Sequence, residues 1–218
     1  MDTFKTKNNL DVKITFIKHG SLMINFNEVI IQIDPVSEYA NYKEFPKADL
    51  ILITHEHSDH FDKKAIRELK KSNTKIILNE NAEKLLGEGI IMKNGDVISI
   101  GKDFEIDAVP AYNTTADRIK YHPNGRDNGY VLTLDGLRIY ISGDAEDIPE
   151  MKNLKNIDIA FLSVNQPYTM TPKQAANAAK IVNSPIVYPY HYGNTDIKKL
   201  VELLKGDKKI EVRIREMQ

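Results

Sequence analysis

The sequence contains no cysteine and no long run of apolar residues. Without cysteine, neither a disulfide nor a thiolate metal site can form. No apolar stretch approaches the roughly 20 residues that a membrane-spanning helix needs. The first residues, Met1 to Asp11, are polar and lack the apolar stretch of a secretory signal. We therefore expect a cytoplasmic protein with no membrane partner.

An excess of charge of one sign is also absent, because 30 basic and 31 acidic side chains give a formal net charge of −1. This balance offers no electrostatic reason to expect binding to nucleic acid or to a membrane surface. The chain has 218 residues, 41% of them apolar, which is enough to bury a substantial core. Since no linker, low-complexity segment or fixed-period repeat interrupts the chain, we predict one domain over residues 1–218.

Short β-branched runs separated by turn residues predict most of the secondary structure. The expected strands lie at 12–17, 22–26, 29–33, 50–53, 75–78, 89–92, 97–100, 104–109, 130–134, 137–142, 157–163, 186–190 and 210–214. Helices are expected from Asp62 through Leu69, from Pro172 to Val182 and around 196–205. Because strands occur in runs as well as in alternation with helices, two mixed sheets packed together with helices outside fit better than one parallel sheet.

Histidine is scarce, with six residues in the chain, yet three of them share "HEHSDH" (55–60) with an aspartate. Since a buried strand precedes the motif, His55 and His57 can project from the same side of extended chain. Asp59 and His60 lie in the turn beyond, so we predict one metal ion for the first pair and a second ion for this pair. Imidazoles and carboxylates without sulfur suit Zn²⁺, Mn²⁺ or Fe²⁺. A polar loop with helix-capping histidines is the alternative, but the spacing is a specific pattern.

The motif resembles the H-x-H-x-D-H signature of the metallo-β-lactamase-fold hydrolases. Further similar segments are "ITFIKHGS" (14–21), "IQIDP" (31–35), "YISGDA" (140–145) and "YPYHYG" (188–193), so the resemblance covers nearly the whole chain. It is greatest for the small bacterial and archaeal branch that includes the L-ascorbate-6-phosphate lactonases, where a segment like "PYTMTPKQAANAAK" (167–180) also occurs. The resemblance implies a four-layer αββα sandwich of two mixed sheets flanked by helices. It also implies two divalent metal ions, with zinc favoured over manganese, iron or nickel.

The resemblance further implies that Asp144 bridges the two ions and that His191 binds the second. The residues themselves agree with these roles. Asp144 follows an apolar strand, and Gly143 lets the backbone pass close to a metal ion. His191 also follows a strand. A turn aspartate and a strand-end histidine without ligand roles are the alternatives.

The expected third histidine of the first metal ion is missing, because "VPAYNTT" (109–115) has Asn113 where many family members have histidine. An amide oxygen is a poorer zinc ligand than an imidazole. Either His122 folds back to complete this site, which we favour, or Asn113 and water leave the site weak and His122 is a surface loop residue. His19 ends the first strand and either contacts substrate in the pocket or packs beside the metal ligands as a donor.

Substrate selection is expected in the loops. The segment 113–129 is long for a plain connection and is a candidate specificity loop. Its basic residues, Arg118 among them, could meet an anionic group on the substrate, although nearby aspartates favour a solvated loop instead. Tyr168, with Asn113 and His19, is a further candidate for substrate contact, the alternative being a core aromatic.

Two metal ions that share one water can lower its pKa to near neutrality. We predict a metal-dependent hydrolase that uses a metal-bridging hydroxide on a small ester, lactone or phosphodiester. Asp59 or Asp144 would orient the water or accept a proton. The alternatives are a non-hydrolytic di-iron redox or ligand-sensing module on the same fold, and a structural metal protein with a closed site.

Overall fold

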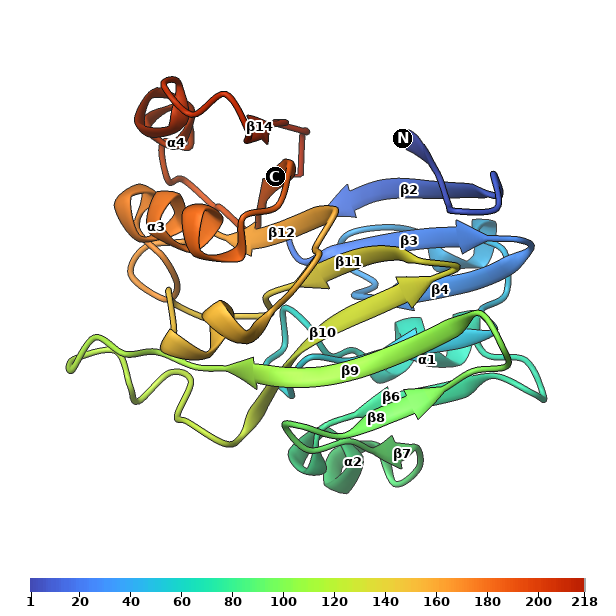
Figure 1. Ribbon diagram of the computed structural model, residues 1–218. Helices are drawn as coiled ribbons and strands as arrows, with labels where there is room; N and C mark the ends of the chain where they lie inside the picture. The colour runs from blue at the N-terminus through green and yellow to red at the C-terminus, as the bar shows by residue number, and fades with distance from the viewer. Residues whose placement is uncertain (218) are drawn as a thin grey trace.

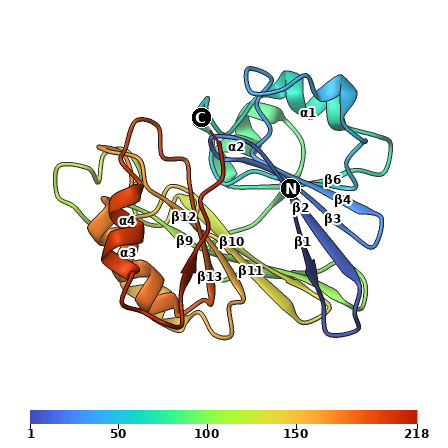
Figure 2. The same ribbon diagram turned by 90° about the horizontal axis from the view of Figure 1, so that it is seen from above.

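A computed structural model describes residues 1–217 and contains two seven-stranded mixed sheets that pack against each other (Figures 1 and 2). In both sheets the strands lie side by side in the order of the sequence. The first sheet contains β1 (Asp2–Lys5), β2 (Asp11–Lys18), β3 (Ser21–Phe26), β4 (Val29–Ile33), β5 (Leu50–Leu52), β6 (Lys75–Leu78) and β7 (Ile90–Ile91). The second contains β8 (Val97–Ser99), β9 (Phe104–Ala111), β10 (Asp127–Leu134), β11 (Leu137–Ile141), β12 (Ile159–Ser163), β13 (Ile186–Tyr190) and β14 (Glu211–Val212).

The two sheets repeat one pattern of pairing. Strands β1 to β4 are antiparallel neighbours and β4 to β7 are parallel, while β8 to β11 are antiparallel and β11 to β14 are parallel. The carboxyl ends of parallel strands meet at one edge of a sheet, which is where α/β proteins usually bind ligands. The turns that follow β4, β5, β11 and β13 are therefore expected to lie close together.

The main core lies between the sheets, because alternate residues of each strand point to one face. In β2, Val12 and Ile14 are buried and Lys13 is exposed. Helices cover the outer faces: α1 (Lys63–Leu69) and α2 (Glu80–Leu86) pack on the first sheet, α3 (Pro172–Val182) and α4 (Lys198–Leu204) on the second. Two short 3-10 helices, η1 (Tyr42–Glu44) and η2 (Pro149–Asn153), complete the described chain. None of the helices formed by residues 1–217 has the length and apolarity to cross a bilayer.

The predicted fold class, two mixed sheets flanked by helices, is confirmed, and every predicted strand overlaps an observed one. The Asp62 side chain accepts a hydrogen bond from the Lys64 backbone N–H and caps α1, as predicted. Four elements were missed: the strand β1, the helix α2 and the two 3-10 helices η1 and η2. Helix α2 buries only Ala82, so its apolar periodicity is weak, although Asn79 caps it and Gly87 ends it in the left-handed conformation. The last residues of the predicted loop 113–129 belong to β10.

Candidate metal centre

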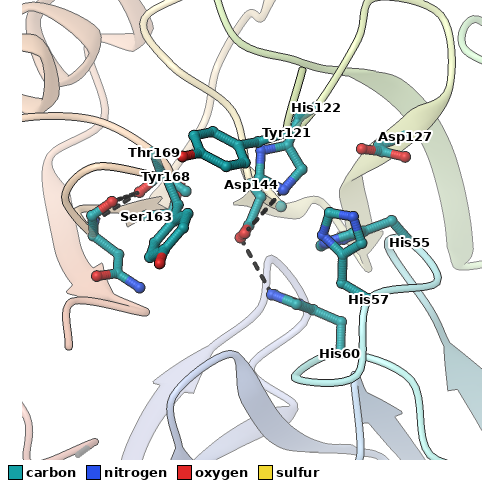
Figure 3. A network of polar contacts seen from close by, with 12 residues as sticks. His55, His57, His60, Tyr121, His122, Asp127, Asp144, Ser163, Tyr168 and Thr169 are labelled. Carbon is teal, nitrogen blue, oxygen red and sulfur yellow. Dashed lines mark hydrogen bonds and ion pairs between the residues drawn. The ribbon is translucent and has the colours of Figure 1, made fainter. Parts of the chain in front are cut away.

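Side chains from distant parts of the chain converge at the carboxyl ends of the strands. His55, His57, Asp59 and His60 follow β5, Asp144 follows β11, and His191 follows β13. His122 comes from the loop between β9 and β10. Figure 3 shows the imidazoles of His55, His57, His60 and His122 around the Asp144 carboxylate. All seven predicted ligands therefore meet in one place.

The first group consists of His55, His57 and His122, whose ligand nitrogens all lie within 4.8 Å of one another. Nε2 of His55 is 3.0 Å from Nδ1 of His57. Burial lowers the pKa of His55 well below its usual range and that of His122 to about 4. Burial and the neighbouring Arg126 guanidinium also lower the pKa of His57. The three imidazoles are therefore neutral near pH 7, which is the form that binds a metal ion.

The second group consists of Asp59, His60, Asp144 and His191, again with ligand atoms within 4.8 Å of one another. Oδ2 of Asp59 is 3.2 Å from Nε2 of His191 and 3.7 Å from Nε2 of His60. Burial opposes ionisation of Asp59, but the charge of His60 and contacts from His19 and His191 outweigh burial. The pKa of Asp59 is therefore well below its usual range, and the side chain is a carboxylate.

Asp144 faces both groups. Its Oδ1 lies 3.3 Å from Nε2 of His60, and its Oδ2 lies 3.4 Å from Nε2 of both His122 and His191. The preceding Gly143 has a φ of +56°, and a Cβ there would lie 2.8 Å from a backbone oxygen. Glycine is therefore required for Asp144 to enter the site.

The electrostatic field of the second group favours a cation. Burial opposes the charge of Asp144, yet His191 and His60 hold the pKa of this carboxyl well below its usual range. Burial also opposes a charge on His60, but the carboxylates of Asp144, Asp34 and Asp59 hold its pKa well above the ordinary value. Three carboxylates around one imidazole thus stabilise positive charge at this position.

The donor set fits metal ions. Within residues 1–217, buried atoms without a hydrogen-bond partner include Nε2 of His60, Nε2 of His122 and Oδ1 of Asp144. Buried polar atoms in native proteins nearly always have a partner. A cation would supply one, and imidazole with carboxylate is a ligand set that suits Zn²⁺, Mn²⁺ or Fe²⁺. Both groups have the residue types and spacing to hold such an ion.

Asp34 and Thr54 contact two of the candidate histidine ligands, His60 and His55, and orient their rings. Oδ2 of Asp34 lies 2.8 Å from Nδ1 of His60, and its Oδ1 accepts from the Thr54 backbone N–H at 2.8 Å. Oγ1 of Thr54 lies 3.0 Å from Nδ1 of His55. Contacts of this kind fix the ring orientation of histidine ligands. Sequence reasoning assigned no role to Asp34, although an Asp-Pro pair directly after a strand is a usable signal.

His122 completes the first group, and Asn113 lies behind it. The His122 side chain is buried, so the alternative of a surface loop residue is wrong. Oδ1 of Asn113 is 2.7 Å from Nδ1 of His122, and Nδ2 of Asn113 donates to the Tyr168 backbone oxygen at 2.7 Å. The expectation that Asn113 contacts substrate needs correction, because both ends of its amide are occupied and it does not line the cavity.

A cavity of about 480 Å³ opens beside the two groups. Five of the seven candidate ligands line it, together with His19, Ser58, Tyr121, Asn165 and Tyr168. His19 lies at the end of β2 and also contacts Asp59, with 3.3 Å between Nε2 and Oδ2. Tyr168 is 45% exposed, so the alternative of a core aromatic is wrong. Sequence reasoning did not single out Ser58, Tyr121 or Asn165 for the pocket.

Arg118 does not line this cavity, and the expectation that it meets substrate needs correction. Its Nη1 lies 3.2 Å from Oε1 of the buried Glu146 and donates to the Thr169 backbone oxygen. Oε2 of Glu146 also accepts from the backbone N–H groups of Thr114 and Thr115, both at 2.7 Å. Glu146, which sequence reasoning missed, therefore holds the start of the loop that carries His122.

Comparison with known proteins gives consistent matches. Residues 13–191 match the family model described as a Beta-lactamase superfamily domain. A UPF0173 metal-dependent hydrolase of Thermococcus onnurineus is 34% identical over 221 residues, which cover 90% of this chain and 93% of that protein. The crystal structure of a protein from Parabacteroides distasonis, assigned as a metal-dependent hydrolase, is 62% identical with a TM-score of 0.97 and covers 100% of this chain and 98% of that one. CmlA, a diiron β-hydroxylase from Streptomyces venezuelae, is 15% identical with a TM-score of 0.77. The match covers 100% of this chain and 54% of that one, and it shows a similar fold alone.

Proposed function

The chain belongs to the β-lactamase superfamily and to its UPF0173 metal-dependent hydrolases, and from this premise we propose that it hydrolyses a small ester, lactone or phosphodiester at a site for two metal ions. The observation that carries the proposal is the position of Asp144. One buried carboxylate faces two separate groups of ligand atoms, with one oxygen near His60 and the other near His122 and His191. A carboxylate in this position suits a bridge between two cations.

We assign one ion to His55, His57 and His122 and the other to Asp59, His60 and His191, with Asp144 shared. Zinc is the metal that we propose, because five imidazoles and two carboxylates make up the donor set. When bound, such ions lower the pKa of water and polarise the bond to be cleaved. The cavity volume falls within the range of about 300–1,000 Å³ that is typical for small-molecule sites.

Asp59 is the candidate for orienting the attacking water. Its side chain is 38% exposed and lines the cavity, whereas the Asp144 side chain is 3% exposed. Because the pKa of Asp59 is low, its carboxylate accepts a hydrogen bond readily but retains a proton poorly. We therefore propose that Asp59 positions the attacking water and that Asp144 holds the two ligand groups together. His19 contacts Asp59 from the cavity wall and limits the rotation of its carboxylate.

Metal analysis combined with hydrolysis assays tests the proposal. We expect about two equivalents of metal ion per chain, and turnover of at least one substrate in a panel of chromogenic lactones, esters and phosphodiesters. His57→Ala should lose about one equivalent and hydrolysis, and Asp144→Asn should lose affinity for both ions. Asp117→Asn, an exposed aspartate in the neighbouring loop, is the matched control.

Different outcomes separate the alternatives. Full metal content in Asp144→Asn would contradict a shared carboxylate. Two equivalents of iron without any hydrolysis would favour the di-iron redox or ligand-sensing module instead. Loss of folding rather than of turnover in His57→Ala would favour a structural metal site.

A further inference from the structure

One wall of the cavity is aromatic. The rings of Tyr121 and Tyr168 pack edge to face, with 5.1 Å between centroids and 72° between ring planes. They come from two different loops, one before β10 and one between β12 and α3. Both line the cavity, and Figure 3 shows both rings beside Asp144. A flat or apolar group bound near Asp144 would therefore lie against aromatic carbon.

This wall is held in place by backbone contacts. The Tyr168 carbonyl accepts from Nδ2 of Asn113 at 2.7 Å, and the Tyr168 N–H donates to the Asn165 carbonyl at 2.8 Å. The Tyr121 carbonyl accepts from Nη2 of Arg126 at 2.8 Å. An aromatic surface that is positioned before binding loses little entropy when a ligand packs against it.

Among residues 1–217, no lysine or arginine lines the cavity. The two nearby arginines are neutralised by buried carboxylates, Arg118 by Glu146 and Arg126 by Asp127, the latter pair at 2.6 and 2.7 Å. The Lys120 ammonium lies over the Tyr121 ring, 5.1 Å from its centroid, and does not line the cavity. An anionic group remote from the reacting bond would therefore be desolvated without a fixed counter-charge, which costs binding free energy.

We propose that the substrate is an uncharged carboxylic ester or lactone that carries an aromatic or other flat apolar substituent, which packs against Tyr121 and Tyr168. This inference rests on the proposed function and narrows its substrate class. In the reaction, the oxygen of water bonds to the carbonyl carbon and the acyl carbon–oxygen bond breaks. The alcohol leaves with one proton of the water, and the acid product releases the other to solvent.

Three acetate esters of primary alcohols test the inference on the full chain loaded with zinc: benzyl acetate, ethyl acetate and 4-carboxybenzyl acetate. We expect kcat/KM for benzyl acetate to exceed the values for both other esters by about three- to tenfold, which is the order of one aromatic contact. Tyr168→Ala should remove most of the preference for benzyl over ethyl acetate. Tyr168→Phe, which keeps the ring, should retain that preference.

A binding measurement without turnover gives a second readout. In saturation-transfer NMR on the metal-free chain, benzyl alcohol should receive saturation from the protein, and 4-(hydroxymethyl)benzoate should receive less. Tyr168→Ala should weaken the benzyl alcohol signal, and Tyr168→Phe should preserve it.

A kcat/KM for 4-carboxybenzyl acetate that equals or exceeds the value for benzyl acetate would overturn the inference. An unchanged preference of Tyr168→Ala for benzyl acetate over ethyl acetate would also overturn it. If the loaded chain hydrolyses none of the three esters but cleaves phosphodiesters, the ester class is wrong while the hydrolase stands. If it hydrolyses nothing, the proposed function itself fails, and the inference fails with it.

Discussion

The amide oxygen of Asn113 lies 2.7 Å from Nδ1 of His122. If Nδ1–H donates to this oxygen, the lone pair of the imidazole is on Nε2, which faces Asp144 at 3.4 Å. Asn113 therefore sets both the tautomer and the orientation of a side chain that completes the first group. Asn113 occupies the position where a histidine ligand was expected. It orients His122, the residue that takes the place of that ligand.

The first prediction follows from this contact. Asn113→Ala removes the acceptor, so we expect the metal affinity of the first group to fall by about 10- to 100-fold. Competition with a coloured chelator measures that affinity. Asn153→Ala, at an exposed asparagine in η2, is the matched control. An unchanged affinity would mean that Asn113 does not position His122 for metal binding.

The second prediction concerns Gly20, which lies beside His60. A Cβ at this position would lie 2.9 Å from Cε1 and 3.1 Å from Nδ1 of that imidazole. His60 is fully buried and held by Asp34, so it has little room to move. Gly20→Ala should displace the ring and lower metal content at the second group, measured by elemental analysis after dialysis. Gly206→Ala, with nothing within 4 Å of its added Cβ, should keep full metal content.

The third prediction concerns Glu146, whose side chain is fully buried and accepts hydrogen bonds from Thr114, Thr115 and Arg118. Glu146→Gln keeps the size of the side chain but leaves the Arg118 charge unpaired. Breaking a buried pair costs roughly 3–5 kcal/mol, and we expect the free energy of unfolding to fall by that order in a urea titration. Hydrogen exchange should accelerate across residues 113–122 before other segments.

Glu28→Gln, in the exposed turn between β3 and β4, is the control for this change. It should alter the free energy of unfolding by less than about 0.5 kcal/mol. If the two variants are equally stable, Glu146 does not hold the loop.

The fourth prediction is a pH dependence of stability. Asp2 forms an ion pair with Arg215, with 2.6 Å from Oδ2 to Nη2, and accepts a hydrogen bond from the Tyr188 hydroxyl. Burial opposes the charge of Asp2, but the contacts from Tyr188 and Arg215 outweigh it and hold the pKa of this carboxyl below its usual value. The pair therefore adds stability above about pH 4, the value expected in the unfolded chain, and loses it as the pH falls further.

Asp2→Asn should lower the melting temperature at pH 7 by about 2–4 °C, which corresponds to roughly 1 kcal/mol for a chain of this size. The difference from the wild type should shrink as the pH falls below about 4, because protonation of Asp2 then removes the charge that the variant also lacks. Thermal melts at several pH values check this. A difference that stays constant with pH would contradict the ion pair.

The sequence by itself determined most of the elements and the local ligands. Strand periodicity and the cap residues Asp62 and Thr171 depend on neighbours a few positions away. The same holds for His55, His57, Asp59 and His60, since one turn after one strand presents all four. Such features need no knowledge of distant segments.

Tertiary structure alone decided which side chain completes the first group and which residues line the cavity. The path of the loop before β10 depends on Glu146 and Asn113. Glu146 contacts Thr114, which is 32 residues away in the sequence, and Asn113 contacts His122 only after the loop has folded back. The ion pair with Glu146 holds Arg118 outside the cavity, whereas Tyr121 and Tyr168 line it. Local periodicity does not encode which buried carboxylate a basic residue will pair with, because Arg118 meets Glu146 only when the loop before β10 packs against the segment that follows β11.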